Sequence, residues 1–134
     1  MSTVSGKFRT PLSRARGLGA AKHGVGHFIA ERVSGMALIP LSIWAAYAGL
    51  KLAAGGYAMA VEWLAHPLNA VLLSLFIVAG FTHLRLAMQV VVEDYVYGFV
   101  SKSSLLILNY LVCVLGAALG VFAILKVALL GASF

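Results

Sequence analysis

The positions of the charged residues constrain this chain more than any other feature. Three long stretches contain no Asp, Glu, Lys or Arg: 33–50, 63–84 and 103–125. Each stretch is long enough for a helix, which rises about 1.5 Å per residue, to cross about 30 Å of hydrocarbon. We therefore predict an all-α membrane protein with three transmembrane helices.

Composition leaves little room for anything beyond these spans. Of 134 residues, 62% are hydrophobic and 10% are charged, and a soluble domain of this length needs more charge to cover its surface. No soluble catalytic domain fits beside three spans. The single cysteine, Cys113, lies in the third apolar run, where it can form no internal disulfide and is expected to be inert.

The basic residues are concentrated before the first span. No acidic residue precedes Glu31, whereas five basic residues do: Lys7, Arg9, Arg14, Arg16 and Lys22. Because cytoplasmic flanks carry an excess of Lys and Arg, we expect the N-terminus to be cytoplasmic, and this distribution argues against nucleic-acid binding. The first apolar run is too long for a signal peptide. The pattern favours a bacterial inner membrane over a mitochondrial inner membrane.

We divide the chain into a basic cytoplasmic N-terminal segment, three spans and two loops. The ranges are 1–31 for the N-terminal segment, 32–53 for the first span, 54–66 for an outer loop, 67–95 for the second span, 96–103 for a cytoplasmic loop and 104–130 for the third span. Pro67 suits the first turn of the second helix. Gly116 and Gly120 have the GxxxG spacing that lets two helices approach closely.

The second span contains ionisable residues, which are costly in a membrane and call for a partner or a task. Asp94 follows His83 by eleven residues, which leaves only about 20° between them around a helix. Gly80 and Ala87 lie on the same stripe and would leave room for a flat ligand. Imidazole is an axial ligand of haem iron. The pattern is therefore compatible with a haem site, or with His83 only hydrogen-bonding a neighbouring helix.

Two arginines have a structural and a functional interpretation. Arg85 lies about 200° from His83 around the helix, and we expect it to snorkel or to pair with a carboxylate of a partner subunit. Arg32 lies at the inner end of the first span. It is either an interfacial anchor or a counter-charge for an anion such as a haem propionate.

Two sequence segments resemble a known family. The run 83–95, HLRLAMQVVVEDY, resembles the second-helix motif of the hydrophobic membrane anchor (the D-type anchor) of succinate dehydrogenase, in which Asp-Tyr follows a haem-ligating histidine by eleven residues. The run 24–36, GVGHFIAERVSGM, resembles the approach to the first helix of that family, including an arginine at the position of Arg32. The three-span layout agrees with both.

The resemblance implies a haem b held between two three-helix anchor subunits. It implies that His83 is this chain's axial ligand of the haem iron and that Arg32 contacts a propionate. It also implies that Tyr95 donates its hydroxyl to a quinone carbonyl and that Asp94 organises that site. The run 32–35, RVSG, resembles the quinone-site sequence of the partner C-type anchor, so Ser34 is a further quinone-binding candidate.

The resemblance also implies partners and a place in respiration. The partners would be a second membrane anchor subunit (the C-type anchor), an iron–sulphur subunit and a flavoprotein subunit, the last two carrying the iron–sulphur clusters and FAD. Electrons from succinate oxidation would reduce ubiquinone and link the tricarboxylic acid cycle to the respiratory chain. This chain would be non-catalytic alone, contributing to the quinone site but not to the succinate site.

Three alternatives remain open from the sequence. The chain could be a haem-free anchor, a fumarate reductase anchor that works with menaquinone, or a small membrane transporter. In a transporter, His83 and Arg85 would line a polar path. A transporter predicts polar groups on several spans, whereas the interiors of the first and third spans carry no charge.

Overall fold

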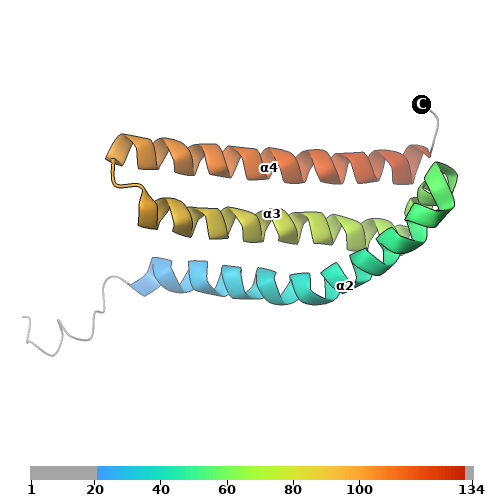
Figure 1. Ribbon diagram of the computed structural model, residues 1–134, viewed down its shortest axis with the longest axis horizontal. Helices are drawn as coiled ribbons and strands as arrows, with labels where there is room; N and C mark the ends of the chain where they lie inside the picture. The colour runs from blue at the N-terminus through green and yellow to red at the C-terminus, as the bar shows by residue number, and fades with distance from the viewer. Residues whose placement is uncertain (1–20, 132–134) are drawn as a thin grey trace, which may run out of the picture.

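Three long helices form a layered, antiparallel arrangement in the computed structural model, which describes residues 21–131 (Figure 1). They are α2 (Ala21–Ala65), α3 (Pro67–Tyr95) and α4 (Phe99–Leu130), and the described residues contain no strand. Helix α3 contacts both of its neighbours. Each helix is long and apolar enough to cross a membrane. The all-α fold with three transmembrane helices is thus confirmed.

The helices extend beyond two of the predicted spans. Helix α3 covers 67–95, the range given for the second span, but α2 begins at Ala21 and α4 begins at Phe99. Helix outside the membrane is expected, because it keeps backbone groups paired wherever the flanking sequence permits. The basic residues of 1–20 lie outside the described residues. The membrane boundaries and the cytoplasmic orientation therefore stay predictions.

The segment 54–66, expected as a loop, is mostly helical. Helix α2 is interrupted at Gly56, whose φ of 71° and ψ of −171° suit glycine alone, and the chain is helical again over 57–65. That short helix is rich in Ala and also carries Met, Glu and Leu, which favour helix. Its Trp63 stacks on Trp44 with ring centroids 5.6 Å apart. The glycine therefore makes a sharp bend between two helical pieces rather than a loop.

Polar contacts define both ends of α3. Pro67 occupies the first turn, and the Asn69 side-chain amide donates to the Trp63 carbonyl at 2.9 Å across the connection from α2. At the other end, the Lys102 ammonium donates to the Glu93 carbonyl at 3.0 Å. A cation suits this end of a helix, where the last carbonyls lack partners within the helix.

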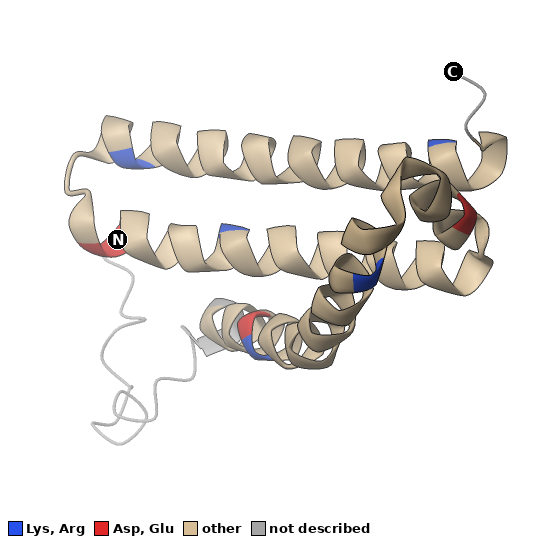
Figure 2. Ribbon diagram, turned by 45° about the vertical axis from the view of Figure 1, so that its right-hand side comes forward, with Lys and Arg blue, Asp and Glu red and all other residues tan. Residues whose placement is uncertain are grey.

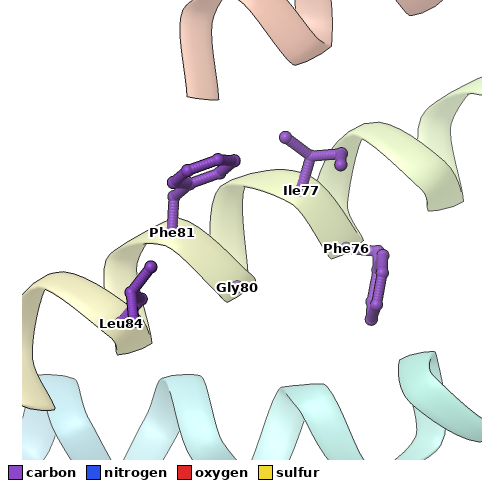
Figure 3. A pocket seen from close by; sticks show the side chains of 5 residues that line it. All are labelled: Phe76, Ile77, Gly80, Phe81 and Leu84. Atoms are coloured by element: carbon purple, nitrogen blue, oxygen red, sulfur yellow. The ribbon is translucent and has the colours of Figure 1, made fainter. Parts of the chain in front are cut away.

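The two glycines at GxxxG spacing pack α4 against α3. Ile77 and Phe81 point from α3 toward α4 (Figure 3). A methyl group at Gly116 would lie 2.5 Å from Phe81 Cε1, and one at Gly120 would lie 2.9 Å from Ile77 Cγ2. Only glycine leaves room for these side chains, so the predicted close approach occurs within this chain.

The outer surface is apolar over most of its length. Charged residues occupy few positions along the described helices, and long parts of α4 carry none (Figure 2). Large apolar side chains such as Ile43, Leu50 and Leu119 are exposed on the isolated chain. Such a surface belongs in lipid or against other subunits rather than in water.

Candidate functional site

His83 contacts α2 from the middle of α3. Its Nδ1 lies 3.2 Å from the hydroxyl oxygen of Ser34. A methyl group at Gly35 would lie 3.4 Å from His83 Cε1, an ordinary van der Waals distance, so the imidazole ring lies beside this glycine. The ring is half-buried. A serine and a glycine, adjacent on α2, thus position one edge of this histidine.

The Ser34 hydroxyl is buried and has two partners. Ser34 is 7% exposed, and its hydroxyl donates to the Glu31 carbonyl at 3.0 Å, one turn back on the same helix. Its other contact is His83 Nδ1. A hydrogen bond to a neighbouring helix therefore accounts for one of the two ring nitrogens of His83. The second nitrogen, Nε2, has no hydrogen-bond partner among the residues whose side chains are described.

His83 and Arg32 line the same cavity, whose volume is about 330 Å³. Its lining combines polar and apolar side chains from α2 with the histidine of α3: Phe28, Glu31, Arg32, Gly35, Met36 and His83. The Arg32 guanidinium lies over the Phe28 ring, 5.2 Å from its centroid. The structure therefore brings together three of the predicted site residues, His83, Arg32 and Ser34.

Gly80 also faces α2 but borders a different cavity. A methyl group at Gly80 would meet Leu38 only at 4.0 Å, which leaves space beside the glycine. This apolar cavity has a volume of about 200 Å³, and its lining comes entirely from α3 (Figure 3): Phe76, Ile77, Gly80, Phe81 and Leu84. The small residue one turn before His83 thus leaves room along the face of α3.

No group of three or more His, Cys, Asp or Glu residues gathers anywhere in 21–131 in a way that could hold a metal ion. The described residues therefore offer no metal site built from such side chains alone.

Asp94 and Tyr95 lie apart from His83, in the last turn of α3. Asp94 follows His83 by eleven positions, about 16 Å along a helix. Both side chains are exposed, and that of Tyr95 is 78% exposed. The predicted quinone residues are therefore divided between two places, because Ser34 lies beside His83 and not beside Tyr95.

Arg85 has partners on α4 that the sequence did not reveal. Its guanidinium lies over the Tyr110 ring, 5.3 Å from the centroid. The Asn109 amide donates to the Arg85 carbonyl at 3.0 Å, and the Cys113 thiol donates to the Asn109 side-chain oxygen at 3.6 Å. The available signal was the pair Asn109-Tyr110, two adjacent polar side chains within the uncharged stretch 103–125.

Comparison with known proteins identifies relatives over most of the chain. Residues 6–124 match the family model described as the succinate dehydrogenase/fumarate reductase transmembrane subunit. A protein of Rickettsia conorii, named a succinate dehydrogenase hydrophobic membrane anchor subunit, is 32% identical over 108 residues, 80% of this chain and 86% of the relative.

Further relatives carry the same name. One from Rickettsia bellii is 30% identical over 66% of this chain and 71% of its own length. One from Paracoccus denitrificans is 25% identical over 75% of this chain and 78% of its own length. No solved structure gives a significant match.

Proposed function

Because this chain belongs to the succinate dehydrogenase/fumarate reductase transmembrane subunit family, we propose that its α2–α3 face holds a haem b with His83 as an axial ligand. The chain is a multi-pass membrane anchor subunit of succinate dehydrogenase, and it associates with other subunits of that enzyme. The specific partners we propose are a second anchor subunit, an iron–sulphur subunit and a flavoprotein subunit.

The observation that carries the haem proposal is the incomplete bonding of His83. One ring nitrogen contacts Ser34, whereas the other has no partner among the residues whose side chains are described, and the ring lines a cavity of about 330 Å³. An ionisable side chain at membrane depth needs a partner or a task. A neutral imidazole nitrogen with a free lone pair is a ligand for haem iron. The residues present therefore fit the group.

Arg32 would bind a haem propionate. It lines the same cavity as His83, and its guanidinium lies over Phe28 with no ion pair in the part of the chain whose side chains are described. A guanidinium forms paired, charge-assisted hydrogen bonds with a carboxylate. When bound, the haem supplies a one-electron redox centre. A second axial ligand would come from the partner anchor.

Tyr95 and Asp94 would form this chain's part of the quinone site. The Tyr95 hydroxyl would donate a hydrogen bond to a quinone carbonyl, and Asp94 would organise the site. Their exposure at the end of α3 supports access by quinone and by an iron–sulphur subunit. With the N-terminus cytoplasmic, this end of the bundle would face the cytoplasm of a bacterial inner membrane. Electrons from succinate would then reduce ubiquinone there.

The second candidate function is that of an anchor of a fumarate reductase, which works in the reverse direction with a menaquinone. The family description names both enzymes, but the reported curated relatives are named after succinate dehydrogenase. We therefore favour succinate oxidation.

The experiment that tests the haem proposal is a reduced-minus-oxidised absorption spectrum of the purified complex. We expect a b-type α-band in the wild type and its loss or shift in His83→Ala. His66→Ala is the matched control, because His66 is exposed at the start of α3, far from the cavity. Absence of the band from a fully assembled wild-type complex would leave a haem-free anchor as the correct account.

A further inference from the structure

We propose that Ser34 is a positioning residue that fixes the tautomer and the orientation of His83, leaving Nε2 as the nitrogen that binds iron. This inference rests on the proposed haem function and deepens it. It gives Ser34 a role different from the quinone contact expected from the sequence.

Hydrogen counting fixes the direction of the contact between Ser34 and His83. A serine hydroxyl has one hydrogen, whereas a backbone carbonyl can only accept. The 3.0 Å contact with the Glu31 carbonyl therefore uses the Ser34 hydrogen. For the 3.2 Å contact with His83 also to be a hydrogen bond, the hydrogen must be on Nδ1 and the serine oxygen must accept it. In a neutral imidazole, both contacts are satisfied only by the Nδ1–H tautomer.

This tautomer determines which nitrogen can act as a ligand. In a neutral imidazole, one nitrogen carries the hydrogen and the other carries the lone pair. With Nδ1 donating to Ser34, the lone pair belongs to Nε2, which has no partner among the residues whose side chains are described. Hydrogen bonding by the non-ligating nitrogen is the general means by which proteins orient metal-binding histidines.

The surroundings make the contact rigid. Ser34 is 7% exposed, so water competes little for its hydroxyl. Gly35 lies under the same edge of the ring, where an added methyl group would be 3.4 Å from Cε1. The ring is therefore held through the contact with Ser34, and the next residue of the same helix turn, Gly35, lies beside it.

The contact also has an electronic consequence. An acceptor on Nδ1–H makes the imidazole a stronger electron donor through Nε2. Stronger donation stabilises ferric over ferrous iron and lowers the reduction potential of the haem. Removing the serine oxygen should therefore raise the potential, in addition to loosening the ligand.

The test combines a redox titration and the electron paramagnetic resonance spectrum of the oxidised haem, both measured on the purified complex. We expect Ser34→Ala to raise the midpoint potential, to change the low-spin haem signal and to weaken haem retention by on the order of 10-fold. Ser34→Thr keeps a hydroxyl able to bond one turn back, so its midpoint potential, low-spin haem signal and haem retention should match those of the wild type.

Ser74→Ala is the matched control, because its hydroxyl likewise donates to a carbonyl of its own helix, Ala70, at 2.8 Å. It should leave the haem properties unchanged. If Ser34→Ala does not assemble, Ser34→Cys preserves the volume while replacing the hydroxyl oxygen with a weak acceptor, and it should also raise the potential.

The outcomes separate this inference from the haem proposal. An unchanged potential and haem signal in the assembled Ser34→Ala or Ser34→Cys complex overturns the role of Ser34, even if His83→Ala still loses the haem. Weaker quinone binding with unchanged haem properties would return Ser34 to the quinone site. A wild-type α-band that survives in His83→Ala overturns both proposals.

Discussion

Two ionisable residues on the same span, His83 and Arg85, are accommodated in different ways. Arg85 lies over Tyr110, and its backbone carbonyl accepts a bond from Asn109, so its neighbours come from this chain. His83 has one nitrogen bonded to Ser34 and lines an open cavity. The two residues are two positions apart, so helix geometry directs Arg85 toward α4 and His83 toward α2.

The difference separates a structural charge from a candidate ligand. From the sequence alone, both residues are ionisable groups within a membrane span, and each calls for a partner or a task. Arg85 has a cation–π contact with α4 and lines a cavity of about 70 Å³, whereas His83 has one ring nitrogen without a partner among the residues whose side chains are described and lines a cavity of about 330 Å³. We therefore infer that the α2–α3 face is the side on which a ligand binds, and that the α3–α4 contact chiefly holds the subunit together.

The largest expected effect comes from crowding the histidine. Gly35→Val should displace the His83 ring, because its first carbon would already be in van der Waals contact with Cε1 at 3.4 Å and its two methyl groups need further space. We expect haem content to fall by roughly 10-fold or more, the range typical of lost support for a metal ligand. Gly49→Val is the control, since nothing lies within 4 Å of a carbon added there. Equal haem content in the two variants would contradict haem binding at the cavity beside His83.

Crowding the opposite face should affect stability instead. Gly116→Leu would collide with Phe81 and should destabilise the subunit by about 1–3 kcal/mol, the usual range for overpacking. Thermal unfolding of the purified complex would measure it, with Ala118→Leu as a control at an exposed position of the same helix. The position of the haem band should not change in the folded variant. A shifted band would mean that the two faces of α3 are not separable.

The end of α3 should be separable from both faces. Tyr95→Phe removes one hydroxyl, and a lost hydrogen bond of about 0.5–1.5 kcal/mol corresponds to roughly 2- to 10-fold slower quinone reduction. The haem spectrum should be unchanged. Tyr97→Phe, in an even more exposed tyrosine, is the control. Wild-type turnover of Tyr95→Phe with a quinone analogue would remove Tyr95 from the site.

The smallest effect is expected at Arg85. Arg85→Met should cost about 0.5–1 kcal/mol, the usual value of a cation–π contact that is not fully buried, and should leave the haem spectrum unchanged. Thermal unfolding and the absorption spectrum measure the two effects. A loss of about 3–5 kcal/mol, or failure to assemble, would instead indicate a buried ion pair with a partner subunit.

The sequence predicted the helices well because a helix that crosses a membrane needs a long run of uncharged residues. Long uncharged runs fixed three helices, and Pro67 marked where α3 begins. The segment 54–66, predicted as an outer loop, is mostly helical. A single residue in a glycine-only conformation bends the chain between two helices, and the stacking of Trp63 on Trp44 could not be foreseen from local composition.

Helical spacing predicted which residues of α3 share a face, but not the contacts that they make with α2. Helical spacing placed His83 and Gly80 on one face, and the structure directs both to α2. The contact between Ser34 and His83 depends on the register of α2 against α3, which spacing within either helix does not determine. The same is true of Arg85 and Tyr110. Residues on different helices meet only once packing is known.

The most direct test of the central claim is chemical rescue of His83→Gly in the purified complex. The substitution removes the imidazole and leaves a space that free imidazole can fill. We predict that the b-type α-band is lost in this variant and returns when imidazole is added, while His66→Gly keeps the wild-type spectrum throughout. A wild-type band in His83→Gly without imidazole would contradict the account, because the iron would then have no need of His83.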